Sequence, residues 1–291
     1  MIETLADPRA AGDLARDALT LDADAAEALV ARLAAPPPGR RWTALATPDL
    51  DGVVFASISD RQAAAGHLDL LAVRPAARER GLGRALVGAA EDWLRAEGAE
   101  TASFAANPPC YAWPGIDVRY TPALCLARSL GYERYDIACN MTVDLSRDFS
   151  SGADEAALAG KGITVHAAPP GERAEVAEFV RREWHGGWAW EAEQAAGCHY
   201  ATRDGRIIAF ASWGSRPLWF GPMGTAEAGR GLGVGRVLLR RCLAEQAAAG
   251  LATAQVGWVD PIHFYAKAVG ARVERVFWLY RRALGAHQEV S

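Results

Sequence analysis

A short glycine-rich sequence that occurs twice constrains the fold of this chain more than any other feature. The first copy runs Arg78-Glu-Arg-Gly-Leu-Gly-Arg84 and the second Arg230-Gly-Leu-Gly-Val-Gly-Arg236, so the pattern Arg-x-x-Gly-x-Gly recurs 152 positions later. Each copy leads into an amphipathic run, which predicts a helix that begins at the glycines. A repeat at a constant offset in a chain of 291 residues predicts two related halves.

A glycine-rich turn at the start of a helix is suited to binding an anion. The first backbone N–H groups of a helix have no partner within the helix, and the positive end of the helix dipole adds to their attraction. Glycines allow the turn dihedrals and the close approach of a ligand, because they carry no Cβ. Both loops are therefore predicted to bind a phosphate or pyrophosphate.

The order of the predicted elements is the same in both halves. Antiparallel strands come first, followed by a strand, the glycine loop, a helix, a further strand, a second helix and a last strand. This order predicts an α/β (α+β) fold with two tandem domains, each a mixed, mostly antiparallel sheet flanked by helices. The first domain is expected at residues 1–147 and the second at 163–291. The segment 148–162 carries few large apolar residues and is predicted to be a linker.

Composition excludes several classes of protein. The net charge of -4 and the isoelectric point near 5.9 argue against a nucleic-acid-binding protein. No apolar run is long enough to span a membrane, and the amino-terminal residues do not resemble a secretory signal. The five cysteines are odd in number and have no Cys-x-x-Cys spacing, so we expect a cytoplasmic protein without a metal.

A dinucleotide-binding fold is the rival interpretation of the glycine loops. That fold requires Gly-x-Gly-x-x-Gly, and neither copy supplies the third glycine at that spacing, since Arg236 and Leu86 stand there. The hairpins that precede both loops also do not fit the alternation of parallel strands and helices in that fold. We therefore set this alternative aside.

With Arg-x-x-Gly-x-Gly at both loops and Phe264-Tyr-Ala-Lys-Ala-Val-Gly-Ala271 near the end, the sequence resembles the GNAT superfamily of acyl-CoA N-acyltransferases, in a tandem arrangement. The resemblance implies that the second loop holds the pyrophosphate of acetyl-CoA and that the preceding strand binds its pantetheine arm. The residues implied in this role are Met223, Gly224, Thr225, Arg230, Gly231, Leu232, Gly233, Val234, Gly235 and Arg236. Their counterparts in the first half are Leu71, Ala72, Val73, Arg78, Gly81, Leu82, Gly83 and Arg84.

The resemblance also implies direct attack of an amine on the thioester, with the second half as the catalytic one. A tyrosine at the position of Tyr265 often protonates the leaving thiolate in this family, whereas the first half carries Leu126 there. Tyr111, Tyr120 or Tyr132 could substitute from another position. The general base is unassigned, because Gly221 or Pro222 occupies the strand position that often carries a glutamate. The candidate bases are Glu183, Glu191, His185, Asp260 and His263.

The acceptor is expected to be a small-molecule amine. Trp184, Trp188 and Trp190 are candidate wall residues of its site, although they could equally form a core cluster. The first half is expected to be either a second acyltransferase or a degenerate copy that shapes the acceptor site. Two further functions stay open: a non-catalytic acyl-CoA sensor and a protein N-acetyltransferase. A monomer or a homodimer is expected, with no nucleic-acid or membrane partner.

Overall fold

The computed structural model describes residues 1–216 and 218–285, and the chain divides there into two compact units. The first unit comprises Met1–Ala138 together with the chain from Val276 onward, and the second comprises Cys139–Arg275. The chain leaves the first unit within strand β7 (Glu133–Asp144) and returns to it within strand β13 (Arg272–Ala283).

This division differs from the predicted one at residues 148–162. The two halves exchange their last strands. The last strand of the first half, β7, pairs with β12 (Thr253–Val256) in the second unit, and the last strand of the second half, β13, pairs with β5 (Thr101–Phe104) in the first. The pattern of apolar residues predicts a strand but does not specify which neighbour it pairs with. The segment expected to be a linker contains helix α5 (Gly152–Ala159). Glu155 of this helix accepts two hydrogen bonds from Arg241 of α8 (Val234–Ala248).

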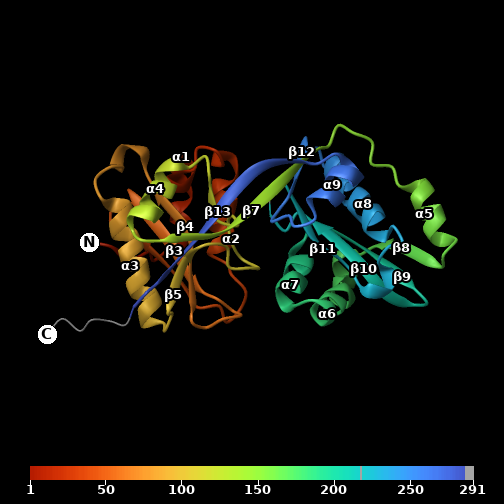
Figure 1. Cartoon of the computed structure of the whole chain (residues 1–291), viewed down its shortest axis with the longest axis horizontal. Coiled ribbons are helices and arrows are strands. Elements are labelled where there is room, and N and C mark those ends of the chain that lie inside the picture. Colours follow the sequence, from red (N-terminus) through yellow and green to blue (C-terminus); the bar gives the residue numbers. More distant parts are fainter. Residues whose placement is uncertain (217, 286–291) are drawn as a thin grey trace. The chain divides into compact units, whose positions relative to one another are not determined.

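The first unit is a sheet with helices on both faces (Figure 1). Its strand order is β1-β2-β3-β4-β5-β13, with β6 paired to β13, and every pairing is antiparallel except that of β4 with β5. The remaining strands are β1 (Glu3–Thr4), β2 (Trp42–Ala46), β3 (Gly52–Ile58), β4 (Ala65–Val73) and β6 (Ile116–Asp117). The α-helices are α1 (Gly12–Ala18), α2 (Ala26–Leu33), α3 (Leu82–Ala96) and α4 (Thr121–Ser129).

Alternation along the strands gives this unit a separate core on each face of the sheet. On β3, Val53 and Phe55 pack with α1 and α2, whereas Val54 and Ala56 pack with α3 and α4. All of β3 is buried, which is expected of a central strand covered on both faces. The loop between β4 and α3 therefore emerges from a rigid, two-sided core.

The second unit repeats this plan. Its strand order is β7-β12-β11-β10-β9-β8, and every pairing is antiparallel except that of β11 with β12. The remaining strands are β8 (Ile163–Ala167), β9 (Gly197–Arg203), β10 (Arg206–Trp213) and β11 (Trp219–Thr225). The remaining α-helices are α6 (Arg173–Glu183), α7 (Gly186–Gln194) and α9 (Ile262–Val269).

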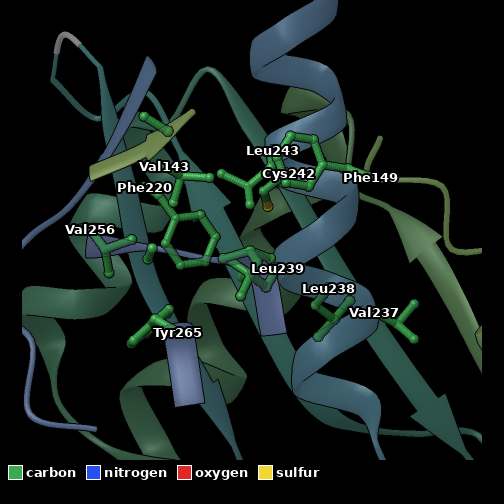
Figure 2. Packing of buried hydrophobic residues seen from close by; sticks show 14 of the residues in the cluster. Val143, Phe149, Phe220, Val237, Leu238, Leu239, Cys242, Leu243, Val256 and Tyr265 are labelled. Carbon is green, nitrogen blue, oxygen red and sulfur yellow. The ribbon is translucent and has the colours of Figure 1, made fainter. Parts of the chain in front are cut away.

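The two faces of the second sheet carry cores of different composition. Aliphatic residues of α8 such as Leu238 and Leu239 form the larger core with α9 and the strands (Figure 2). On the opposite face, Phe210 of β10 packs with α6 and α7. Most of the segment from Trp184 to Trp190 belongs to the first part of α7, where the His185 Nδ1 atom caps the helix by accepting from the Trp188 N–H at 3.2 Å.

Candidate active site

The two glycine loops have the same local geometry. Gly81 and Gly233 adopt left-handed φ angles of 82° and 93° and stand directly before α3 and α8, and neither helix has a side-chain cap at that end. Only glycine adopts this conformation without strain. The first N–H groups of both helices are therefore presented at the helix end, where an anion can bind.

The arginine that leads each copy of the motif has a structural role in both. Arg78 Nε donates to the Val73 carbonyl at 3.1 Å, and Arg230 Nε lies 3.4 Å from the Thr225 carbonyl, five residues earlier in each case. Each arginine thus fastens its loop to the end of the preceding strand. The arginine at the start of the motif therefore has a role in the geometry of the loop, in addition to the positive charge that it carries.

A cavity of about 640 Å³ opens beside the first loop. Every residue predicted to bind coenzyme A in the first half lines it: Leu71, Ala72, Val73, Arg78, Gly81, Leu82, Gly83 and Arg84. The remaining walls come from the segment after α1, from the loop around Trp113 and from α4. The volume falls in the range of small-molecule sites, which is about 300–1,000 Å³.

Asp69 brings a buried carboxyl group to this cavity. It lies on β4 at a β-bulge, because Phe55 pairs with Leu70 and the next residue of β3, Ala56, pairs with Leu68, which leaves Asp69 without a strand partner. Its Oδ1 atom is buried and has no partner of hydrogen-bond geometry among the described residues. Burial raises the pKa of the Asp69 carboxyl from 3.8 to about 7. A carboxyl group with this pKa can accept or release a proton near neutral pH.

Sequence reasoning missed Asp69, although a signal was present. In the second half, Gly221 or Pro222 occupies the strand position that often carries a carboxylate. The repeat offset leads from Gly221 back to Asp69. Asp69 is a single acidic residue within an apolar strand that leads directly to the glycine loop, and this feature could have identified it from the sequence.

The three tyrosines considered for the first half lie in different places. Tyr120 lines the cavity, and its hydroxyl donates to Asp22 Oδ2 at 3.0 Å and accepts from the Leu21 N–H at 3.1 Å. The described lining does not include Tyr111 or Tyr132, and the Tyr132 hydroxyl donates to Glu91 at 2.8 Å. Leu126, at the position that corresponds to Tyr265, also lines the cavity.

The residues around the second loop are packed differently. Trp184 lies against Gly224, where an added Cβ would be 2.4 Å from its ring. Met223 and Leu232 pack on the aliphatic core, and Val234 is buried. The remaining predicted loop residues, Arg230, Gly231, Gly233, Gly235 and Arg236, are exposed or partly exposed, and Arg236 is paired with Asp154 at 2.6 Å.

Tyr265 is a core residue of the second unit (Figure 2). Its ring packs edge-on against Phe264 and Phe220, with centroid separations of 5.0 and 6.3 Å. Burial raises the pKa of the Tyr265 hydroxyl to about 12. The side chain is therefore neutral at physiological pH, which a proton donor requires.

The candidate bases of the second half do not form one cluster of buried carboxylates. Glu191 is buried and paired with Arg216 at 3.3 Å. Glu183 is exposed and lies 3.3 Å from Arg182, and both Asp260 and His263 are exposed. Glu191 is thus held in a buried ion pair, whereas Glu183, Asp260 and His263 lie at the surface.

The three candidate wall tryptophans are partly buried. Trp184 and Trp188 pack against the core of α6 and α7, with Trp184 edge-on to Phe179 at 5.6 Å and tilted against Phe210 at 5.5 Å. Trp190 lies on α7 and is partly exposed. Whether any of them contacts an acceptor stays a prediction.

The described residues contain neither a cluster of metal ligands nor a membrane-spanning helix. Across the part of the chain that the structure describes, no group of three His, Cys, Asp or Glu side chains could hold a metal ion. Among the same residues, no helix is both long and apolar enough to cross a membrane.

Known proteins share this sequence pattern and fold. Residues 12–112 match the profile of the acetyltransferase (GNAT) family. A mycothiol acetyltransferase of Thermomonospora curvata is 30% identical over 208 residues, which are 65% of this chain and 64% of that protein. The structure of a tandem GNAT protein from the clavulanic acid biosynthesis pathway has a TM-score of 0.73 at 18% identity, with 99% of both chains covered. A GCN5-related N-acetyltransferase from Sphaerobacter thermophilus has a TM-score of 0.68 at 20% identity, with 98% and 96% covered.

Residues 12–112 thus carry the sequence profile of the GNAT acetyltransferase family, and the fold of the whole chain is that of a tandem GNAT protein. The residues that match the family profile lie in the first unit and include β4, the first glycine loop and α3. The predicted resemblance to this family and the predicted fold class are thus confirmed. The chain spans just under two thirds of the length of the mycothiol acetyltransferase it matches.

Proposed function

We propose that this protein transfers an acetyl group from acetyl-CoA to the primary amine of a small molecule, and that the first unit performs the transfer. One observation carries the proposal: a single cavity combines the end of β4, the first glycine loop and the buried carboxyl of Asp69. The match of residues 12–112 to the profile of the GNAT acetyltransferase family supports the reaction type.

The roles of the residues follow from where they line the cavity. The N–H groups at the start of α3 bind the diphosphate of acetyl-CoA, and the backbone of residues 71–73 pairs with its pantetheine arm. This arrangement brings the thioester toward Asp69. The Asp69 carboxylate accepts a proton from the ammonium of the acceptor, and the neutral nitrogen attacks the carbonyl carbon. The C–S bond then breaks, the acetyl group stays on the nitrogen, which releases its second proton to solvent, and coenzyme A leaves as a thiolate that takes a proton from solvent.

The walls of the cavity favour a cationic acceptor with an apolar body. Trp113 and Tyr120 contribute aromatic surface and Asp69 contributes a carboxyl group, whereas the Asp117 carboxylate is paired with Arg119 at 2.8 Å. An ammonium group is attracted both to carboxylates and to aromatic faces. A small amine suits a cavity of this volume better than a protein chain, so a protein N-acetyltransferase is the less favoured alternative.

The second unit has a separate proposed role as a site that binds acyl-CoA without transfer. Its glycine loop has the same left-handed geometry as the first, but Gly221 stands where the first unit carries Asp69. Tyr265 remains the candidate proton donor if this unit does transfer an acyl group. A sensor function for the whole chain would require both units to lack transfer.

The experiment is an acetyl-CoA consumption assay across a library of amines, with wild type and Asp69→Asn compared as a function of pH. We expect the wild-type rate to rise with pH and to level off above about 7, because the carboxyl must be ionised to act as a base. The Asp69→Asn variant should lose at least about 10²-fold in turnover while it still binds acetyl-CoA. Unchanged turnover in Asp69→Asn would remove the proposed base, and no wild-type turnover with any amine would favour the sensor.

A further inference from the structure

Residues 105–115, the wall loop, form one side of the cavity in the first unit. Four of them line the cavity: Ala105, Ala112, Trp113 and Gly115. The wall loop closes on itself at its base, where Ala105 and Gly115 form an antiparallel bridge and the Ala106 N–H donates to the Pro114 carbonyl at 2.9 Å. These contacts fix the base of the loop, so the position of its tip depends on other residues.

The wall loop begins beside Asp69. The parallel pairing of β4 with β5 extends to His67 and Ser103, and Asp69 and Ala105 each lie two residues further along their strands. The His67 Nδ1 atom is 2.9 Å from the Ala105 carbonyl, which keeps β4 and the start of the loop together. The residues proposed to bind acetyl-CoA lie at the end of β4 and on the glycine loop. The wall loop therefore bounds the part of the cavity that is left for the acceptor.

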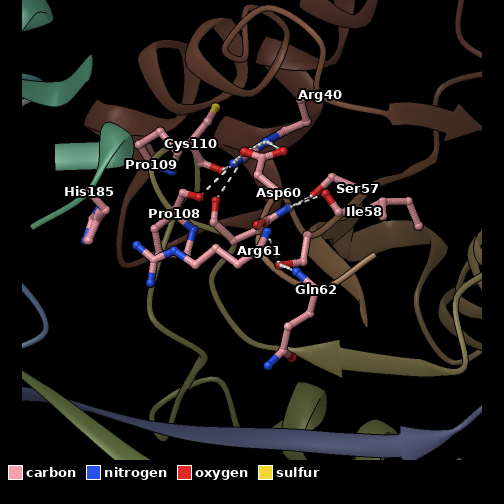
Figure 3. Close-up of polar contacts among 12 residues, drawn as sticks. Arg40, Ser57, Ile58, Asp60, Arg61, Gln62, Pro108, Pro109, Cys110 and His185 are labelled. Carbon is pink, nitrogen blue, oxygen red and sulfur yellow. Dashed lines mark hydrogen bonds and ion pairs between the residues drawn. The ribbon is translucent and has the colours of Figure 1, made fainter. Parts of the chain in front are cut away.

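The guanidinium of Arg40 holds the tip of the wall loop. Its Nη1 atom donates to the Asn107 and Cys110 carbonyls at 2.8 and 2.9 Å, and Nη2 donates to the Pro108 carbonyl at 2.7 Å (Figure 3). The Arg40 side chain is 2% exposed, and Asp60, just after β3, accepts from its Nε atom at 3.1 Å. A carbonyl removed from water requires a donor, and here one planar group supplies donors to three of them. The three carbonyls are thus held as a unit.

Two more side-chain contacts fasten the same tip to the body of the first unit. The Asn107 Nδ2 atom donates to Ser57 Oγ at 2.7 Å and to the Ile58 carbonyl at 3.0 Å, both on β3. Arg32 of α2 donates through Nη2 to the Pro109 carbonyl at 2.8 Å. The tip is therefore attached to β3 and to α2 as well as to Arg40.

Trp113 follows the tip and is the largest wall-loop residue that lines the cavity. Its ring stacks on that of Phe277, with centroids 6.1 Å apart and planes 14° apart. We propose that Arg40 is a positioning residue for the acceptor: by holding the tip, it keeps Ala112 and Trp113 where they limit the bulk of the amine that reaches Asp69. This inference rests on the proposed function. The described lining of the cavity does not include Arg40, so it acts through the loop.

The test compares the steady-state kinetics of wild type, Arg40→Lys and Arg40→Met with the amine that the wild type acetylates fastest. Arg40→Lys keeps the positive charge but replaces the planar fork with a single ammonium, which cannot bind all three carbonyls and Asp60 together. Both variants should raise KM for the amine about tenfold, as a poorer pocket fit does. The kcat at saturating amine should stay within about threefold, and the dissociation constant of acetyl-CoA should not change.

Specificity among amines gives a second readout. In wild type, one methylene added to the body of the best amine should lower kcat/KM about tenfold, because a firmly held wall does not yield. In Arg40→Lys this penalty should fall below about threefold. If Arg40→Lys keeps the wild-type KM and specificity and only Arg40→Met loses them, the charge of Arg40 matters and its hold on the carbonyls does not. That result would overturn the proposal.

Arg95→Met is the matched control. Arg95 Nε donates to the Leu284 carbonyl at 3.0 Å, so this variant also takes a guanidinium from a main-chain carbonyl of the first unit. Arg95 lies on α3, outside the described lining of the cavity. The control should lower the melting temperature and leave KM for the amine unchanged. The same pattern in Arg40→Lys would mean that Arg40 only stabilises the fold, which contradicts the proposal.

Hydrogen exchange tests the hold on the loop without an acceptor. Backbone amides of residues 105–115 should exchange about tenfold faster in Arg40→Lys than in wild type, since the loop opens more easily when its charged donor is lost. An unchanged rate would show that Arg40 does not hold the loop. If neither Arg40 variant folds, Asn107→Ala loosens the same tip from β3 and should also raise KM for the amine; an unchanged KM there refutes the inference.

The outcome is separable from that of the proposed function. If no amine is acetylated by the wild type, the proposed function fails, and the role of Arg40 in acceptor binding fails with it. If Asp69→Asn abolishes turnover while Arg40→Lys keeps both the KM and the specificity of wild type, the proposed function stands and the positioning role is refuted.

Discussion

Asp69→Asn should make the protein more stable than wild type at alkaline pH, and the gain should grow with pH. The folded pKa of Asp69 is about 7, whereas its value in the unfolded chain is near 3.8. Between these values the unfolded state releases a proton that the folded state retains, so folding loses free energy as the pH rises. Each pKa unit corresponds to about 1.4 kcal/mol, so the buried charge destabilises the fold by about 4 kcal/mol above pH 7.

The measurement compares unfolding free energies of the two proteins at pH 5 and pH 8 by scanning calorimetry. Two of the roughly three pKa units lie within this window, so the stability difference between Asp69→Asn and wild type should increase by about 3 kcal/mol. Asp24→Asn removes an exposed aspartate of the same unit and serves as the control, with the pH dependence of wild type. A difference that is equal at the two pH values would mean that Asp69 ionises as in the unfolded chain. The cavity would then contain no base poised near neutrality.

Three further predictions concern single residues of the two units. Gly81→Ala should weaken acetyl-CoA binding about tenfold, as measured by titration calorimetry. The backbone φ of 82° is strained for a residue with a Cβ, and the added Cβ would occupy the open space beside the helix end. Unchanged affinity would argue against this loop as the diphosphate site. Tyr265→Phe should change turnover less than twofold if the first unit performs the transfer, and a loss near 10²-fold would assign it to the second unit. Gly224→Ala should destabilise the second unit by about 1–3 kcal/mol in thermal unfolding, since its Cβ would lie 2.4 Å from the Trp184 ring, and an unshifted transition would refute this.

The helix starts were predictable because their cause is local. Gly81 and Gly233 are each followed by apolar residues at helical spacing, and this local pattern predicts where α3 and α8 begin. The partner of a strand is not local: β7 and β13 were predicted as strands, but their exchange between the units depends on pairing with segments far away in sequence. The burial of Asp69 also depends on residues far away in sequence. The walls of the cavity desolvate its carboxyl group, and a β-bulge between β3 and β4 leaves it without a strand partner.

The two units retain different parts of the expected catalytic pair. The first has a strand carboxylate, Asp69, and Leu126 in place of the tyrosine, while the second has Tyr265 and Gly221 in place of the carboxylate. The two roles are not equally demanding. A primary ammonium has a pKa near 10.4, so only about one molecule in a few thousand is neutral at pH 7, whereas a thiol with a pKa near 8.5 leaves as a thiolate at little cost. Removal of the proton from the amine is therefore the step that most requires a protein group, and the unit that keeps the carboxylate is the better equipped to catalyse transfer.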